Sequence, residues 1–346
     1  MVANAVVMAA LAIACSIELG YPLRDPDGFL GPSWVRLPAL IGLAFVADVV
    51  PRALWRSRHH LAGVREEAVA VVREHWNRER VLLVVLGLVT FYGTYVSYRN
   101  LKNYLPFIRP HTYDYTLHAL DRWLLFGNDP AVVLHTIFGT GLAAQVFSLI
   151  YLLFLPMVPI APAVWLVWSR RTSFGYWFVT ADCLAWSLGT ASYYLIPTLG
   201  PNFAFEWLYT GLSRTGVTQL QDALFYGRQN IRYDPFADGV QSVAGFASLH
   251  VAITLVMALV AHYTVRHRII RIGLWVYLVL VVLSTSYFGW HYIADDVAGA
   301  VIALVSVYVG AWATGHRVPW RGRPGTPFYH QRPGRGADRP KLTEQV

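Results

Sequence analysis

The sequence predicts an all-α membrane protein, a polytopic helical bundle with about eight transmembrane helices. Its composition is the first reason: 14% of the 346 residues are charged and 55% are hydrophobic, with a mean hydropathy of +0.41. A water-soluble domain carries about 25% charged residues. The second reason is that apolar runs of about 20 residues, enough to cross roughly 30 Å of hydrocarbon, recur along the chain. These features exclude disordered, fibrous, coiled-coil and disulfide-rich secreted proteins.

Each expected span is an apolar run bounded by polar residues. The first run has no Lys or Arg before it, which argues against a cleaved signal peptide, so we expect it to remain as a span. The second run is the shortest. Cys15 and Cys183 both fall inside apolar runs, so we expect neither a disulfide framework nor a zinc-type cysteine cluster. The expected spans cover residues 2–19, 35–50, 81–98, 141–168, 175–196, 246–265, 269–288 and 294–314.

The basic residues predict the orientation of these spans. With the N-terminus inside, the cytoplasmic segments hold 19 of the 28 lysines and arginines, as the positive-inside tendency requires. The net charge of +8 then reflects membrane topology, and we expect no nucleic-acid partner. We therefore predict a multi-pass protein of the plasma membrane with both termini in the cytoplasm. The basic segments are 51–80, 169–173, 262–272 and the tail from residue 315.

Four regions follow from this pattern. Residues 1–50 hold two N-terminal spans, and residues 81–314 hold the remaining spans. Residues 51–80 mix charged and apolar side chains, and we expect either a cytoplasmic interfacial helix along the inner surface or a solvated linker helix. Residues 315–346 are rich in Arg, Pro and Gly, so we expect a disordered basic cytoplasmic tail.

Three polar clusters lie at the outer ends of the predicted spans. The predicted topology depends on the basic loops, whereas the clusters consist of other residues. That all three clusters fall on the same side of the membrane therefore supports the topology independently. We therefore expect a site on the outer face. The clusters are Lys102 with Arg109, Ser248 with His250, and His291 with Asp295.

The first two clusters suit a phosphate ligand. Lys102 offers a point charge and Arg109 a planar fork, which are two complementary ways to hold an oxyanion. Ser248 is a candidate N-cap, so backbone N–H groups and the positive end of a helix surround His250. A plain structural explanation also exists, because basic residues and histidines often anchor or cap helices at a membrane boundary.

The third cluster suits nucleophilic chemistry. His291 and Asp295 are spaced i, i+4 and therefore share one helix face. A carboxylate that binds one imidazole nitrogen sets the tautomer and leaves the other nitrogen free to attack. An aspartate at a helix start also has a structural use, since it complements the helix dipole. The joint order, spacing and common side of the three clusters favour a single phosphate site.

This pattern resembles a known family. The order Lys-x6-Arg-Pro, Ser-x-His and His-x3-Asp is similar to that of the type-2 phosphatidic acid phosphatase superfamily, which also includes vanadium haloperoxidases. The stretches 194–201, 248–250 and 117–127 (LHALDRWLLFG) resemble its inositol phosphorylceramide synthase-like branch. The resemblance covers residues 81–314 and implies a catalytic membrane domain with a six-helix phosphatase-type core.

The resemblance also implies roles for individual residues. His291 corresponds to the nucleophile that forms a phosphohistidine, and Asp295 to the carboxylate that orients it. His250 corresponds to the general acid that protonates the leaving group and then acts as a base. The family needs no metal ion or other cofactor, since its cations stabilise the phosphate. The phosphate-binding set corresponds to Lys102, Arg109 and Ser248.

Two departures from the family pattern stand out. Ala247 replaces the proline of the second motif, and Ser284-Thr285 replaces the Ser-Arg of the third, so one phosphate-binding cation is absent. Loss of one such donor commonly costs about 10² to 10³ in rate. Either Arg228 and Arg232 of a long outer loop or Thr285 itself compensate, or these arginines are solvated surface groups. A less charged phosphodiester donor also fits the missing cation.

Two further features are weaker leads. Residues 111–129, which include His118, Asp121 and Arg122, read as an amphipathic re-entrant or interfacial helix that forms one wall of the site. Asp182 lies inside an apolar run, where ionisable groups either contact a neighbouring helix or line a path for a polar headgroup.

The predicted function is an integral membrane lipid phosphatase or phosphotransferase. We expect a phospholipid or polyprenyl-phosphate substrate, and transfer of a phospho-headgroup to a lipid or polyol acceptor. A pure lipid phosphate phosphatase, with water as the acceptor, is the alternative. A non-catalytic phosphate-lipid binding protein or transporter is a further alternative, favoured by the missing arginine. The sequence predicts no oligomeric state.

Overall fold

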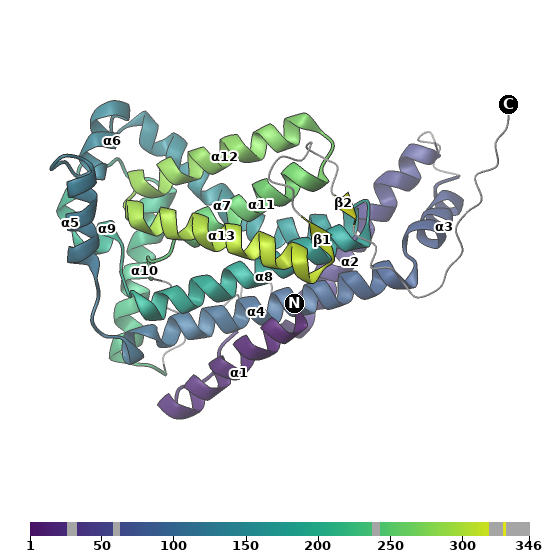
Figure 1. Ribbon diagram of the computed structural model, residues 1–346, viewed down its shortest axis with the longest axis horizontal. Helices are drawn as coiled ribbons and strands as arrows, with labels where there is room; N and C mark the ends of the chain where they lie inside the picture. Colours follow the sequence, from purple (N-terminus) through teal and green to yellow (C-terminus); the bar gives the residue numbers. More distant parts are fainter. Residues whose placement is uncertain (26–32, 58–62, 237–242, 318–327, 330–346) are drawn as a thin grey trace.

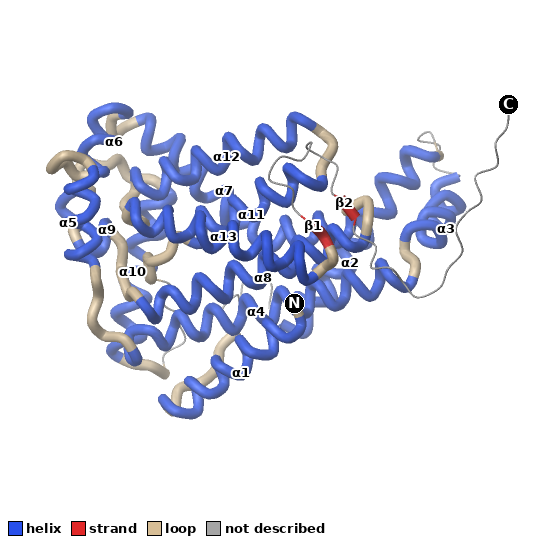
Figure 2. The backbone as a smooth tube through the Cα atoms, viewed as in Figure 1, coloured by secondary structure: helices blue, strands red, loops and turns tan. Residues whose placement is uncertain are grey.

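The computed structural model describes residues 1–25, 33–57, 63–236, 243–317 and 328–329, which form a helical bundle (Figure 1). The predicted fold class is confirmed. Figure 2 shows helices throughout, and within these residues strands are confined to the antiparallel pair β1 (His316–Arg317) and β2 (Phe328–Tyr329). The predicted tail otherwise lies outside the described residues.

All eight predicted spans are helices. They are α1 (Val2–Leu19), α2 (Ser33–Arg56), α4 (Arg78–Ile108), α7 (Leu142–Trp168), α8 (Thr172–Leu195), α11 (Leu249–Thr264), α12 (Arg268–Tyr287) and α13 (Ile293–Ala313). Among the described residues, six of them are long and apolar enough to cross a membrane: α1, residues 38–56 of α2, α4, α7, α12 and α13. Of the other two, α11 is apolar but shorter, and α8 carries Asp182 and several hydroxyl side chains. The chain is therefore a multi-pass membrane protein.

The predicted helix over residues 51–80 is divided in the structure. Residues 51–56 continue α2. Arg52 forms an i, i+4 ion pair with Asp48 at 2.8 Å, and this pair stabilises the helix beyond the end of its apolar run. A separate helix, α3, covers Val64–His75. The next helix, α4, starts at Arg78 because the Asn77 side chain caps it.

The long helices pack around α8. This helix contacts α4, α7, α11 and α13. Small residues allow the close approach, since the Leu249 side chain occupies the space where a Cβ of Gly189 would lie. Trp165 of α7 stacks on Phe178 of α8 with ring centroids 4.1 Å apart. On the other side, Asn4 of α1 donates to Ser187 of α8 at 2.8 Å.

The bundle has two different ends (Figure 1). One end, here called the α5 end, carries the short helices α5, α6, α9 and α10; α3 and the β1–β2 pair lie toward the other, called the α3 end. At the α5 end α4 finishes and α11 and α13 begin. The short elements there are α5 (Asp114–Leu124), α6 (Pro130–Phe138), α9 (Pro201–Ala204), a 3-10 helix (Glu206–Leu208) and α10 (Gly216–Tyr233).

Candidate active site

Residues from three distant parts of the sequence meet at the α5 end. His250 lies in the first turn of α11, whereas His291 lies in the turn between α12 and α13. The Nδ1 atom of His250 and the Nε2 atom of His291 are 3.0 Å apart and share a hydrogen bond whose donor depends on the tautomer. The structure thus brings together two histidines that are 41 residues apart in the chain.

Asp295 lies behind the second histidine. Its Oδ2 atom is 3.4 Å from Nδ1 of His291, the ring nitrogen that faces away from His250. The same oxygen accepts a hydrogen bond from the backbone N–H of Tyr292 at 3.0 Å, which holds the carboxylate in place. His291 is 6% exposed and Asp295 is fully buried. The order His250, His291, Asp295 therefore forms a relay in which the central His291 ring lies between a second imidazole and a carboxylate.

Ser248 joins the start of α11 to this relay. Its side chain accepts a hydrogen bond from the N–H of Val251 at 3.3 Å and so caps α11, as the sequence predicts. Its backbone N–H donates to the carbonyl of Asp295 at 2.9 Å. A Cβ on Gly245 would meet the side chains of Thr198 and Asp295, so the segment before Ser248 passes close to the carboxylate.

Burial controls the charge of the central histidine. Desolvation, together with the nearby Lys102 ammonium, lowers the pKa of His291 to about 3. The ring is therefore neutral at physiological pH, and one nitrogen carries a free lone pair. The other histidine lies among aromatic rings, since the His250 ring is 4.5 Å from Phe154 and 4.9 Å from Tyr151 between centroids.

Lys102 is held beside the histidines by aromatic side chains. Its Nζ atom donates to the Tyr98 hydroxyl at 3.3 Å and lies 4.9 Å from the centre of the Tyr193 ring. Arg109 lies farther along, as the C-cap of α4, and is half-buried. Among the described residues its guanidinium has no hydrogen bond or ion pair, so it is open to a ligand, but no contact joins it to the histidines.

The predicted accessory residues lie apart from the relay. The Thr285 hydroxyl donates back to the carbonyls of Val281 and Val282 and is fully buried, so it is directed along its own helix. Arg232 on α10 is exposed to solvent. Arg228 is half-buried, and burial, with repulsion from Arg232, lowers its pKa to about 10, so it stays charged.

Helix α5 braces the turn that carries His291. The Asp114 carboxylate accepts hydrogen bonds from the Tyr292 hydroxyl at 2.9 Å and from the N–H of Gly200 at 3.0 Å. Seven residues later, Asp121 accepts from the N–H of Ile293 at 3.1 Å, at the start of α13. In the structure, the predicted wall helix within residues 111–129 therefore supports the turn before α13 through hydrogen bonds.

Asp114 was not among the predicted site residues. The available signal was its spacing, because positions seven residues apart lie on the same face of a helix, and Asp114 shares that face with Asp121. Desolvation raises the pKa of Asp121 to about 7, with a hydrogen bond from Ile293 acting in the opposite direction.

The loop after α8 completes the frame. The Thr198 carbonyl accepts from the N–H of Gly245 at 2.9 Å, and its hydroxyl accepts from the N–H of Phe246 at 2.8 Å. Gly200 has φ = 99° and lies so close to the Trp290 carbonyl that a Cβ would collide with it. This loop therefore fastens the segment before α11 to the turn before α13.

Several buried polar atoms at the relay, among them Nδ1 of His291, have no hydrogen-bonding partner among the described residues. They also include the indole N–H of Trp290, Oδ1 of Asp295 and Oδ1 of Asp296. Trp290 stacks on Tyr151 with ring centroids 5.0 Å apart, which fixes its plane. Within the described residues no group of three or more His, Cys, Asp or Glu side chains is arranged to hold a metal ion.

The chain matches a model of a known family. A family model described as the PAP2 superfamily matches residues 115–309, more than half of the chain. The matched region contains Ser248, both histidines and Asp295, while Lys102 and Arg109 precede it. Searches of curated proteins and of solved structures found no match.

Proposed function

The chain belongs to the PAP2 superfamily, and we propose that it is a phosphotransferase that cleaves a lipid-linked phosphoester and passes the phospho-headgroup to an alcohol. Membership of the superfamily supports a phosphatase-type lipid phosphoesterase. The transferase activity, the phosphohistidine and the inositol phosphorylceramide synthase-like branch are parts of the proposal. The proposal also places the protein in the plasma membrane, with the site on the outer face and both termini in the cytoplasm. The basic segments at the α3 end support this orientation.

The relay of His250, His291 and Asp295 carries the proposal. A neutral imidazole with a carboxylate on one nitrogen and a proton donor facing the other is arranged for attack on phosphorus. The distance of 3.4 Å between Nδ1 of His291 and Asp295 is long for a hydrogen bond. We expect it to shorten when phosphorylation makes the ring cationic, because catalytic hydrogen bonds often tighten only along the reaction.

The proposed reaction has two steps. In the first, Nε2 of His291 attacks phosphorus, the bond from phosphorus to the leaving oxygen breaks, and protonated His250 gives its proton to that oxygen. In the second, His250 takes the proton of an alcohol whose oxygen attacks phosphorus, and the bond to Nε2 breaks. Both nitrogens now face each other at 3.0 Å, so the rings must separate to admit the phosphoryl group.

The phosphate is held by charges and by an unused donor. Lys102 lies beside the histidines. The Arg109 fork at the end of α4, which has no hydrogen bond or ion pair within the described part of the chain, is the natural second cation. The buried N–H of Trp290 has no partner among the described residues and is next to His291 in the chain, so it is a candidate donor where the family places an arginine. A neutral donor suits a singly charged phosphodiester better than a doubly charged monoester.

A cavity of about 330 Å³ beside the relay turn supports a hydroxylated acceptor. It lies against the turn because Tyr209 packs on Gly289, and Gln221 donates to the carbonyl of Phe288 at 2.8 Å. Carboxylate and amide groups with aromatic rings are typical of sites that bind polyols, by hydrogen bonds and stacking. Its lining includes Asn202, Glu206, Tyr209, Gln221, Asp222 and Tyr226.

The test combines lipid analysis with trapping of the intermediate. Purified protein in vesicles is incubated in EDTA with phosphatidate, phosphatidylinositol or polyprenyl phosphate, with diacylglycerol, ceramide or a polyol as acceptor. We expect a new phospholipid product and an acid-labile phosphohistidine, both lost in His291→Ala. The His75→Ala variant, altered at the α3 end, is the matched control and retains both.

The other outcomes separate the alternatives. Release of phosphate or a phospho-headgroup to water without need of an acceptor would establish the pure phosphatase. Binding of lipid phosphate that persists in His291→Ala, with no covalent intermediate in the wild type, would establish the binding protein or transporter.

A further inference from the structure

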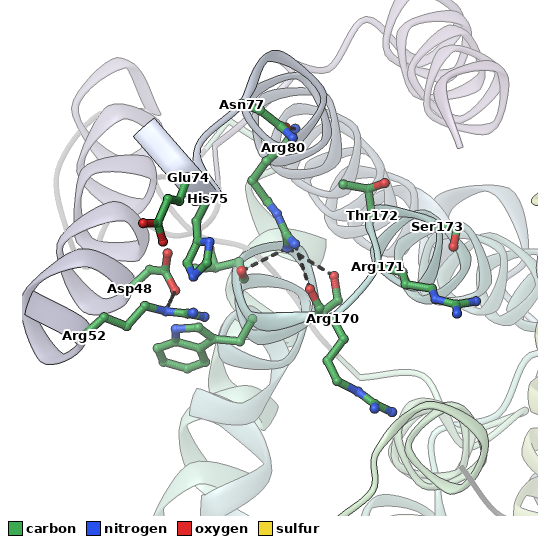
Figure 3. A pocket seen from close by; sticks show the side chains of 13 residues that line it. Asp48, Arg52, Glu74, His75, Asn77, Arg80, Arg170, Arg171, Thr172 and Ser173 are labelled. Atoms are coloured by element: carbon green, nitrogen blue, oxygen red, sulfur yellow. Dashed lines mark hydrogen bonds and ion pairs between the residues drawn. The ribbon is translucent and has the colours of Figure 1, made fainter. Parts of the chain in front are cut away.

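A large cavity lies at the α3 end, away from the histidine relay. It has a volume of about 1090 Å³ and separates the ends of α2 and α3 from the connection between α7 and α8 (Figure 3). Seven of its lining side chains are ionisable, whereas the relay residues take no part in it. The charged residues and the histidine are Asp48, Arg52, Glu74, His75, Arg80, Arg170 and Arg171.

The two acids of this cavity are already neutralised. Asp48 accepts hydrogen bonds from Arg52 and from the indole of Trp76, both at 2.8 Å, so it holds one wall together. Glu74 accepts from Arg56 at 2.7 Å. Each carboxylate therefore has its own arginine, and among the described residues neither Arg80 nor Arg170 has a carboxylate partner.

Two of these cations have neutral partners. Arg80 donates to the carbonyls of Val167 and Ser169, at 3.0 and 2.8 Å, in the connection after α7 (Figure 3). Arg170 donates to the carbonyl of Thr264 at 3.0 Å. Desolvation and repulsion from Arg266 and Arg171 lower the pKa of Arg170, which agrees with a positive potential around this connection.

The start of α8 adds further donors on the same wall. Thr172 and Ser173 line the cavity, and the Ser173 hydroxyl has no hydrogen-bonding partner among the described residues. The first N–H groups of a helix and the positive end of its dipole favour an anion. The wall therefore offers hydrogen bonds as well as charge.

The position of the cavity indicates the source of the anion. The apolar helices α2 and α7 end here, and α4 begins here, so the cavity lies at the depth of lipid headgroups. Trp76 donates to Asp48 on the wall of the cavity, and Trp168, which is 46% exposed, lines it; tryptophan is typical of a membrane boundary. Basic pockets between transmembrane helices at such a boundary suit phospholipid headgroups.

We propose that this cavity binds the phosphate of an anionic phospholipid headgroup from the leaflet at the α3 end. Arg170 and Arg171 supply the charge, and the start of α8 supplies hydrogen bonds to the phosphate oxygens. The volume is sufficient for a glycerophosphate headgroup, since ligand pockets typically measure about 300 to 1,000 Å³. This site is independent of the proposed phosphotransferase activity.

Photo-crosslinking tests the proposal and locates the lipid. The full chain is reconstituted in phosphatidylcholine vesicles with a little phosphatidylglycerol that carries a photoactivatable group on its headgroup, and labelled peptides are mapped by mass spectrometry. We expect labelling across residues 166–175, with a much weaker signal from an equally modified phosphatidylcholine. Arg170→Gln with Arg171→Gln should reduce this labelling roughly fivefold per arginine.

The control removes the same charge at the other end. Arg122 and Arg214 are exposed at the α5 end, where Arg122 donates to the carbonyl of Gly127, much as Arg170 does to Thr264. The Arg122→Gln with Arg214→Gln variant should keep the labelling of residues 166–175. Competition on the wild type needs no variant: unlabelled phosphatidylglycerol should displace the probe and phosphatidylcholine should not.

Three results would overturn the proposal. The first is equal labelling of residues 166–175 by the anionic and zwitterionic probes. The second is full labelling of the double Arg170 and Arg171 variant, provided that this variant elutes from a size-exclusion column as the wild type does and is therefore folded. The third is displacement of the probe by inorganic phosphate as effectively as by phosphatidylglycerol, which would assign the cavity to a free anion.

Discussion

The two ends of the bundle handle polar groups in opposite ways. At the α5 end the three aspartates around the relay turn are buried, since Asp114, Asp121 and Asp295 are each at most 2% exposed, and each has backbone donors around it. At the α3 end the charges face an open cavity, and Glu74 has a side chain that is 53% exposed. Buried polar groups are strongly coupled to their neighbours, whereas exposed charges are screened. One end therefore suits chemistry and the other suits reversible binding.

The largest expected contrast is between two histidines. His291→Ala should lower turnover by about 10⁴-fold or more, because it removes the proposed nucleophile, and Asp295→Asn by about 10³ to 10⁴-fold, because it disturbs the tautomer. His75→Ala at the α3 end should change turnover less than twofold. Steady-state kinetics in vesicles measures all three. Turnover within tenfold of the wild type for His291→Ala would remove the relay from the mechanism.

A second contrast compares the hydrogen bonding of two buried aspartates, Asp114 at the α5 end and Asp48 at the α3 end. Tyr292→Phe removes only the hydroxyl that donates to Asp114 and frees the turn before α13, so we expect kcat to fall about 10- to 10²-fold with KM little changed. Asp48→Asn at the α3 end weakens the pairing with Arg52 and should lower the melting temperature by a few degrees while leaving kcat intact. Equal loss of kcat in both variants would show that general destabilisation, and no specific positioning, is responsible.

A third contrast concerns pH. Burial raises the pKa of Asp121 to about 7, above its value in the unfolded chain, so its favourable contribution is present below about pH 4 and is lost as the pH rises through 7. Relative to Asp121→Asn, the wild type should therefore lose a few degrees of melting temperature between pH 4 and pH 7. The hydrogen bond from Arg56 lowers the pKa of the exposed Glu74, so Glu74→Gln should give a small difference of opposite sign. Parallel curves for wild type and Asp121→Asn would contradict this assignment.

The smallest contrast is between two arginines of α10. Arg228 is half-buried near Asp114, and Arg228→Gln should raise KM about threefold to tenfold, while the exposed Arg232→Gln should stay within twofold. Substrate titration of both variants measures the difference. If Arg232→Gln raised KM more than Arg228→Gln did, the accessory cation would be Arg232 and not Arg228.

Periodicity and hydropathy predicted the helices well, and predicted their ends less well. Each of the eight apolar runs is a helix, because a chain in hydrocarbon must satisfy its backbone groups internally. The helices α2 and α4 extend beyond their apolar runs, since pairs such as Asp48 with Arg52 and caps such as Asn77 act outside the hydrocarbon. Hydropathy alone does not detect such local hydrogen bonds.

The candidate site was predicted in part. Motif order identified Ser248, His250, His291 and Asp295, and the structure brings these four together. The order of the motifs did not predict Asp114. This residue braces the site only because α5 lies against a loop that is more than 80 residues away in the chain. For Thr285, the sequence allowed a role as phosphate donor, whereas its hydroxyl is used by its own helix.

The amino-acid sequence alone was sufficient for the class of fold, the order of the helices and the residue types of the site, because these depend on composition, local periodicity and spacing within single helices. The tertiary structure was needed for the facing imidazoles, the brace from α5 and the basic cavity at the α3 end. These features join segments that are far apart in the chain. Packing around α8 brings α11 and α13 together, while α5 packs on α13 and α2 packs on α3, α4 and α7. Desolvation, which keeps His291 neutral, likewise depends on that packing.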